Sequence, residues 1–200
     1  MKNISYLLLT ILLCITASAQ ENTFFSKTDA FLKKHVSDNK VDYNAIKKNP
    51  SELDEILKII ADYELTKDEN TNKSFLINAY NLLVIKGISA KFPVKSPLDI
   101  AGFFDKTSYT ISNKKVTLND IENKMLRAKY NDARLHFVLV CGSNGCPPLL
   151  AEAYFPKNLD AKLNQQATKA LNNPNFIKVE GNKIQLSQIF EWYKIGRAHV

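Results

Sequence analysis

Apolar residues recur along most of this chain at the three- and four-residue spacing of amphipathic helices. After Ser51 the apolar positions are Leu53, Ile56, Leu57, Ile60 and Tyr63. This spacing predicts a helix with one buried face, capped by Ser51. The same pattern predicts an N-terminal helix that ends near Val36 and a later helix over about 159–171.

One long segment, from about Lys67 to Ala90, is apolar nearly all round. Such a helix is usually buried in the centre of a domain. Thr66 and Glu69 have the spacing of a capping box at its start, and Pro93 requires that it end earlier.

Ser74, Asn78 and Asn81 form one polar stripe on this predicted central helix. Buried amides are normally hydrogen-bonded. The stripe therefore faces either a main-chain segment or a polar cleft, and both alternatives stay open at the level of sequence.

The remaining elements are short. Two hairpins are predicted, over 107–111 with 115–117 and over 176–179 with 183–186, and the run 135–140 is predicted to be a strand. Helices are expected over 118–128, from Pro147 to about 154, and after Ser187. The predicted fold class is α+β: a helix-dominant single domain with a central buried helix, a short strand and small β-hairpins.

The two ends of the chain differ from the rest. Residues 1–19 have a basic start, a short apolar run and the small residues Ala17 and Ala19, the pattern of a secretory signal peptide. Lipidation at Cys14 is the alternative, but Leu13 is not the small residue expected before it. Residues 195–200 resemble a translated sequencing adapter, so we expect one globular domain over 20–194 and a natural chain that continues further.

Charge and composition limit the range of possible functions. Of 27 basic residues, Lys2 and Arg197 lie outside 20–194, which leaves 25 basic residues against 20 acidic ones. The excess is small and consists of scattered lysines, so we expect no nucleic-acid partner. We also expect no cofactor, no membrane span after signal cleavage, and a periplasmic or extracellular location with an unknown envelope substrate or partner.

Glu122 and His136 are the first candidates for chemistry. Glu122 lies in the middle of the apolar arc of its predicted helix, where a carboxylate needs a partner or a shifted pKa. An ion pair with Arg127 or Arg134 is the structural interpretation. His136 is predicted to be at least partly buried on its strand, either as a core residue or as a base oriented by a glutamate.

Cys141 and Cys146 are the third candidate, in a glycine-containing segment that ends in two prolines. A helix that begins at Pro147 would make Cys146 its N-cap, where a thiolate is favoured. A Cys141–Cys146 disulfide is the alternative. The C-x4-C spacing does not match the usual zinc or redox motifs.

A family resemblance follows from the order of these motifs. They are VDY (41–43), FLINAYN (75–81), NDIE (119–122), RLHF (134–137), CGSNGCP (141–147) and LSQIFEWY (186–193). Over about 41–194 the chain resembles domain-of-unknown-function family 547, whose members usually continue with an Asp-Phe pair and more helix. The resemblance implies a domain and little mechanism.

Three functions remain open. The first is a thiol-dependent hydrolase or transferase in which Cys146 is the nucleophile, His136 the base and Glu122 the orienting group, with Asn78, Asn81 and Cys141 as binding residues. The second is a non-catalytic binding or scaffold domain with a disulfide. The third is a metal site that uses Glu122, His136 and one or both cysteines.

Overall fold

The centre of the fold is α4 (Glu69–Lys91), whose side chains are buried along most of its length. The structure, a computed structural model, describes residues 23–142, 147–174, 176–187 and 190. The predicted central helix is therefore confirmed. Its cap differs from the prediction, because the side chain of Asp68 accepts from the amide of Thr71 at 2.6 Å and the Thr66–Glu69 box does not form.

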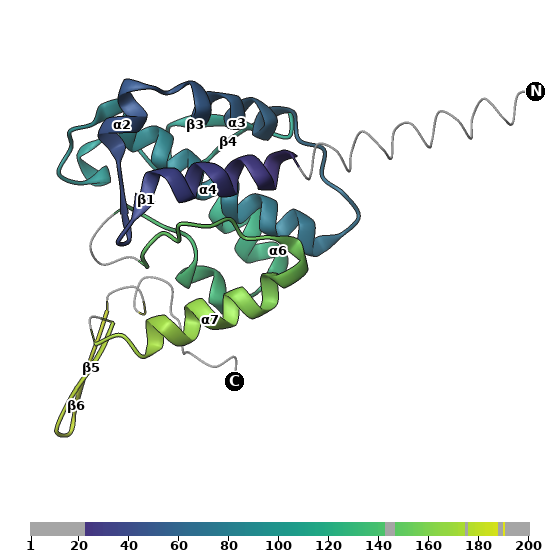
Figure 1. Ribbon diagram of the computed structural model, residues 1–200. Helices are drawn as coiled ribbons and strands as arrows, with labels where there is room; N and C mark the ends of the chain where they lie inside the picture. Colours follow the sequence, from purple (N-terminus) through teal and green to yellow (C-terminus); the bar gives the residue numbers. More distant parts are fainter. Residues whose placement is uncertain (1–22, 143–146, 175, 188–189, 191–200) are drawn as a thin grey trace, which may run out of the picture.

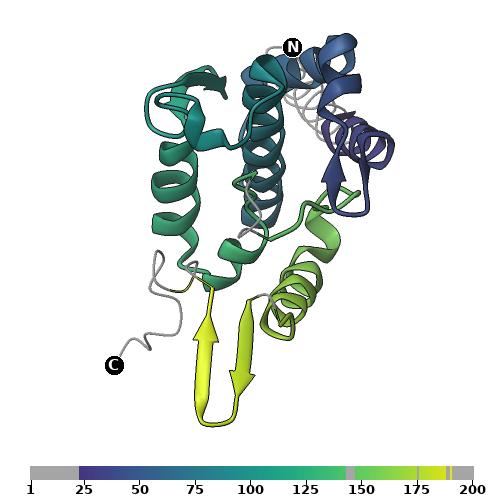
Figure 2. The same cartoon turned by 90° about the vertical axis from the view of Figure 1, so that its left-hand side faces the viewer.

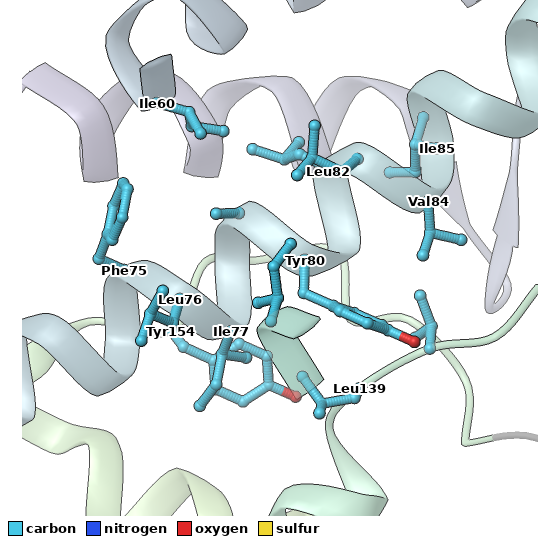
Figure 3. Close-up of a cluster of buried hydrophobic side chains, with 14 of the residues drawn as sticks. Ile60, Phe75, Leu76, Ile77, Tyr80, Leu82, Val84, Ile85, Leu139 and Tyr154 are labelled. Carbon is cyan, nitrogen blue, oxygen red and sulfur yellow. The ribbon is translucent and has the colours of Figure 1, made fainter. Parts of the chain in front are cut away.

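From residue 23 on, where the described chain begins, three helices precede α4 and cover one side of it. They are the helix over 23–35, α2 (Tyr43–Lys48) and α3 (Ser51–Asp62). Aromatic rings join them to α4: Tyr63 stacks on Phe75 with ring centroids 3.8 Å apart, and Phe24 meets Phe75 edge-on at 5.0 Å. Figure 3 shows α4 directing Phe75 and Leu82 toward this side, and Ile77 toward Tyr154 and Leu139 on the other. The prediction that Ser51 caps α3 is wrong, because Ser51 is the first helical residue and Pro50 occupies the N-cap position.

A second helical run lies beside α4, as Figure 2 shows. It consists of α5 (Leu118–Asp120), the π-helix η2 (Ile121–Arg127) and α6 (Ala128–Tyr130). The predicted helix over 118–128 is confirmed, and its π-helical centre was not predicted. Thr117 caps it through a reciprocal box with Asp120.

All strands among the described residues belong to two-stranded antiparallel hairpins. They are β1 (Val36–Ser37) with β2 (Lys40–Val41), β3 (Ser108–Ile111) with β4 (Lys114–Thr117), and β5 (Ile177–Glu180) with β6 (Lys183–Leu186). Both predicted hairpins are confirmed. The β3–β4 turn caps the end of α3, because the amides of Ser112 and Asn113 donate to the carbonyls of Ile60 and Ala61. The β5–β6 hairpin projects from the body beyond α7 (Leu159–Leu171), the predicted later helix (Figure 1).

Two predictions for the segment after α6 are wrong. Residues 135–140 form no strand: Ala133–Phe137 are the 3-10 helix η3, and 138–140 continue without sheet pairing. The predicted helix after Pro147 is absent from 147–154, which are irregular. Two further 3-10 turns are η1 (Pro97–Asp99) and η4 (Pro156–Asn158). The fold is α+β with helix dominant, as predicted, and no helix in the described ranges is long and apolar enough to cross a bilayer.

Candidate functional site

A cavity of about 490 Å³ opens between α4, η1 and η2. Its wall includes polar groups from Tyr80, Glu122 and Arg127 and apolar side chains from Leu98 and Phe104. Small-molecule sites have this range of volume and this mixture of an apolar lining with a few polar groups. The cavity is therefore the candidate site in the described part of the chain.

Glu122 is the buried carboxylate of this cavity. Glu122 is only 8% exposed, and the apolar arc around it in the sequence predicts this burial. The hydroxyl of Tyr80, from α4, donates to Glu122 Oε2 at 3.2 Å. Arg134, one of the two arginines expected to pair with Glu122, instead pairs with Asp132 and Asp160 at 2.8 Å.

Arg127 lines the same cavity as Glu122, and the helix between them is π-helical. In η2 the amide of Ala128 donates to the carbonyl of Asn123, five residues earlier. Residues five apart therefore lie about one turn apart, whereas in an α-helix they point about 140° away from each other. π-Helical turns of this kind occur often at functional sites.

A ladder of side-chain hydrogen bonds holds the Arg127 guanidinium. Arg127 Nη1 donates to Asn123 Oδ1 at 2.5 Å, and Asn123 Nδ2 donates to Asn119 Oδ1 at 2.8 Å. All three side chains line the cavity. Sequence reasoning did not identify Asn119, Asn123 or the cavity role of Arg127, although their four-residue spacing predicts one polar face.

His136 lies on η3 and is only 7% exposed. Burial, together with the positive charge of Arg127, lowers the pKa of His136 to about 4. The imidazole is therefore neutral at pH 7. A general base works best when its pKa is near the operating pH, so a ring with this pKa is a weak base for activating a thiol.

Asn78 and Asn81 both bind main-chain segments, which is one of the two alternatives for the polar stripe. Asn78 donates to the carbonyl of Tyr154 at 2.8 Å and accepts from its amide at 3.0 Å. Asn81 makes the same pair of bonds with the carbonyl of Val138 and the amide of Val140, both at 3.0 Å. A role for these amides in binding a substrate stays a prediction.

Cys141 comes directly after Val140 in the chain and lines the cavity. It is disulfide-bonded, and its partner cysteine lies outside the described residues, as does Cys146. Gly142 has φ +71°, and a Cβ there would lie 2.5 Å from Ile88 Cδ1. A glycine is thus needed where the chain passes closely over α4 after Cys141.

The site residues predicted from the sequence are only partly assembled around the cavity. Glu122 and Cys141 both line it, His136 lies close enough for Arg127 to act on it electrostatically, and Cys146 lies outside the described residues. Within the described residues no group of three or more His, Cys, Asp or Glu side chains is arranged to hold a metal ion.

Comparison with known proteins identifies the domain. The family model described as "Protein of unknown function, DUF547" matches residues 64–171. None of the curated proteins and none of the solved structures matches the chain. The matched range covers more than half of the sequence and contains α4, η2, η3 and all the residues that line the cavity. The chain belongs to the DUF547 family.

Proposed function

We propose that this protein is an exported domain that binds a small molecule in the cavity at Glu122 and does not form a covalent bond with it. The observation that carries the proposal is that Cys141 is disulfide-bonded and lines the same cavity as the buried Glu122. A disulfide in the wall of a binding site fixes the shape of that wall. Preorganisation of this kind lowers the ordering cost of binding.

Two further observations support binding over thiol catalysis. A sulfur in a disulfide is no nucleophile, because the thiolate is the reactive form. The pKa of His136, lowered to about 4 by burial and by Arg127, is far below the value suited to a base at neutral pH. The signal-like pattern of residues 1–19 supports export, and an oxidising compartment would maintain the disulfide.

The test is a thiol count on the mature protein made under oxidising conditions. We expect no thiol to react with a chromogenic disulfide reagent in denaturant before reduction, and two after it. The Cys141→Ser variant should then expose one thiol without reduction. Two reactive thiols in the untreated protein, with rapid alkylation of Cys146 in the native state, would overturn the proposal.

The second candidate is the thiol-dependent hydrolase or transferase. The observation in its favour is that Glu122 and Cys141, which the sequence assigns to one site, line one cavity. Hydrolysis of activated ester substrates that appears only after reduction, and that Cys146→Ser abolishes, would favour this candidate. The control is Glu55→Gln, a change at an exposed carboxylate on α3.

A further inference from the structure

We infer that the β5–β6 hairpin is a self-association surface. The outer edge of β5 pairs antiparallel with β5 of a second copy, in register about Val179, and the two hairpins form one four-stranded sheet. The hairpin lies beyond residues 64–171, which match the family model, and none of its residues lines the cavity. The inference is therefore independent of the proposed binding function.

The first observation is that this hairpin has little support from the rest of the fold. Figures 1 and 2 show it extending away from the helical body. Near its base Ile177 packs against a small cluster of Phe137, Ala170 and Phe176, but all four residues of β6 are exposed. A hairpin of two strands alone is only marginally stable in water, and three or more strands are needed. Two copies joined edge to edge have four.

The second observation is an apolar face that is open to water. In the hairpin Ile177 is paired with Leu186, and Val179 with Ile184. Cross-strand partners and residues two apart share a face, so these four apolar side chains lie together. Val179 and Ile184 are 66% and 65% exposed. In the joined sheet the Val179 side chains of the two copies are neighbours, with Cβ atoms about 5 Å apart, and cover each other from water.

The third observation is the direction of the main-chain groups of β5. The amide of Ser187 donates to the carbonyl of Phe176 at 2.7 Å, so Phe176 directs its main chain toward β6. This direction alternates along a strand, and Ile177 and Val179 therefore direct their main-chain groups to the outer edge. Among the described residues no strand pairs with that edge. The Val179 residues of two copies can thus exchange a pair of main-chain hydrogen bonds.

The fourth observation is charge, and it selects a second copy as the partner. Lys178 and Glu180 flank Val179 and form an exposed ion pair at 2.7 Å. In an antiparallel pairing centred on Val179, Lys178 of each copy lies directly opposite Glu180 of the other. Opposite charges in such positions stabilise a sheet, whereas like charges destabilise it. A lysine usually keeps other strands away from an edge, but a two-fold axis here gives each lysine a glutamate.

The test is sedimentation velocity of the mature, oxidised protein from micromolar to millimolar concentration. The shared surface is small, so we expect a reversible dimer of low affinity. Lys178→Glu and Glu180→Lys each place like charges opposite one another, and each variant alone should dimerise roughly tenfold or more weakly. An equimolar mixture of the two variants should dimerise again, because every opposed pair then joins a carboxylate to an ammonium group.

A pair of proline variants identifies the edge. Val179→Pro removes an outward N–H and leaves the ladder to β6, so it should abolish the dimer. Ile184→Pro is the matched control, because Ile184 is the equally exposed cross-strand partner of Val179 and directs its N–H to the opposite edge. It should leave the dimer intact. Melting curves of each variant establish that it is folded.

Three results would overturn the inference. The first is a monomer at every concentration. The second is a mixture of Lys178→Glu and Glu180→Lys that dimerises no better than either variant alone. The third is a dimer that Ile184→Pro abolishes and Val179→Pro does not, since the contact would then lie at β6.

Discussion

The side-chain amide of Asn81 pairs with the main chain of Val140 as a neighbouring strand would. Its Oδ1 accepts from the Val140 amide at 3.0 Å, and its Nδ2 donates to the Val138 carbonyl at 3.0 Å. A helix side chain thus satisfies two buried main-chain groups in an apolar segment that has no sheet partner. Because Cys141 comes next, this contact also positions one wall of the cavity.

Replacing Asn81 with leucine should destabilise the protein strongly. Two buried main-chain groups lose their partners, and each unsatisfied group costs about 1–3 kcal/mol. We expect a loss of about 2–4 kcal/mol in the free energy of unfolding, measured with urea. The control is Asn70→Leu, an exposed position on the same helix. Similar stabilities for the two variants would contradict the structural role of Asn81.

Gly142→Ala should cost more stability than Gly181→Ala. Both glycines have positive φ, +71° and +57°, so the backbone strain is similar. A Cβ at position 142 would meet Ile88 Cδ1 at 2.5 Å, whereas nothing lies within 4 Å at position 181. We expect a difference of about 1–3 kcal/mol from this overpacking, measured by urea unfolding. If both variants lost the same stability, backbone strain alone would account for the effect of Gly142→Ala.

The lowered pKa of His136 predicts that the folded protein loses stability in mild acid. Its pKa is about 4 in the folded protein against 6.5 in a model peptide, because burial and Arg127 disfavour the charged form. Between these values the unfolded chain binds more protons than the folded one, so stability falls as the pH decreases from 6.5 to 4. Urea unfolding across this range measures the decline, which His136→Gln should flatten.

The contribution of Arg127 can be separated from that of burial in the same experiment. Arg127→Gln removes a positive charge that disfavours the protonated imidazole, so it should raise the pKa of His136. The pH range over which stability falls should then become narrower. Lys124→Gln is the control. A proton-resonance titration of the imidazole reports the value directly, and an unchanged pKa in Arg127→Gln would show that burial alone sets it.

Export is tested at the N-terminus. Fusion of residues 1–25 to a reporter that is active only outside the cytoplasm should give signal, because the apolar run and the small residues before Gln20 fit a cleaved signal peptide. Mass spectrometry of the processed protein should find Gln20 as the first residue. A lipid-modified N-terminus at Cys14 would contradict this.

Local chemistry in the sequence was sufficient to predict the β3–β4 and β5–β6 hairpins and the central helix. Ser112 and Asn113 adopt positive φ in the β3–β4 turn, and Gly181 does so between β5 and β6. The same kind of turn at Asp38 and Asn39 forms the β1–β2 hairpin, a signal that sequence reasoning missed. A helix that is apolar nearly all round, as α4 is, is stable only when it is buried in the centre of the domain.

The sequence by itself determined that Glu122 is buried and that the segments around 51–62, 69–91 and 159–171 are helical, because these properties follow from the period of apolar residues. His136 is buried as predicted, although the strand on which that prediction relied is absent. Only the tertiary structure decided what surrounds these two side chains. An apolar run such as 135–140 suits a strand equally well, but Ala133–Phe137 form a 3-10 helix, and the amide of Asn81 from a distant helix bonds the main chain of Val138 and Val140. Glu122 and Arg127 line one cavity across a helix that is wound as a π-helix, and the sequence pattern does not reveal this local winding.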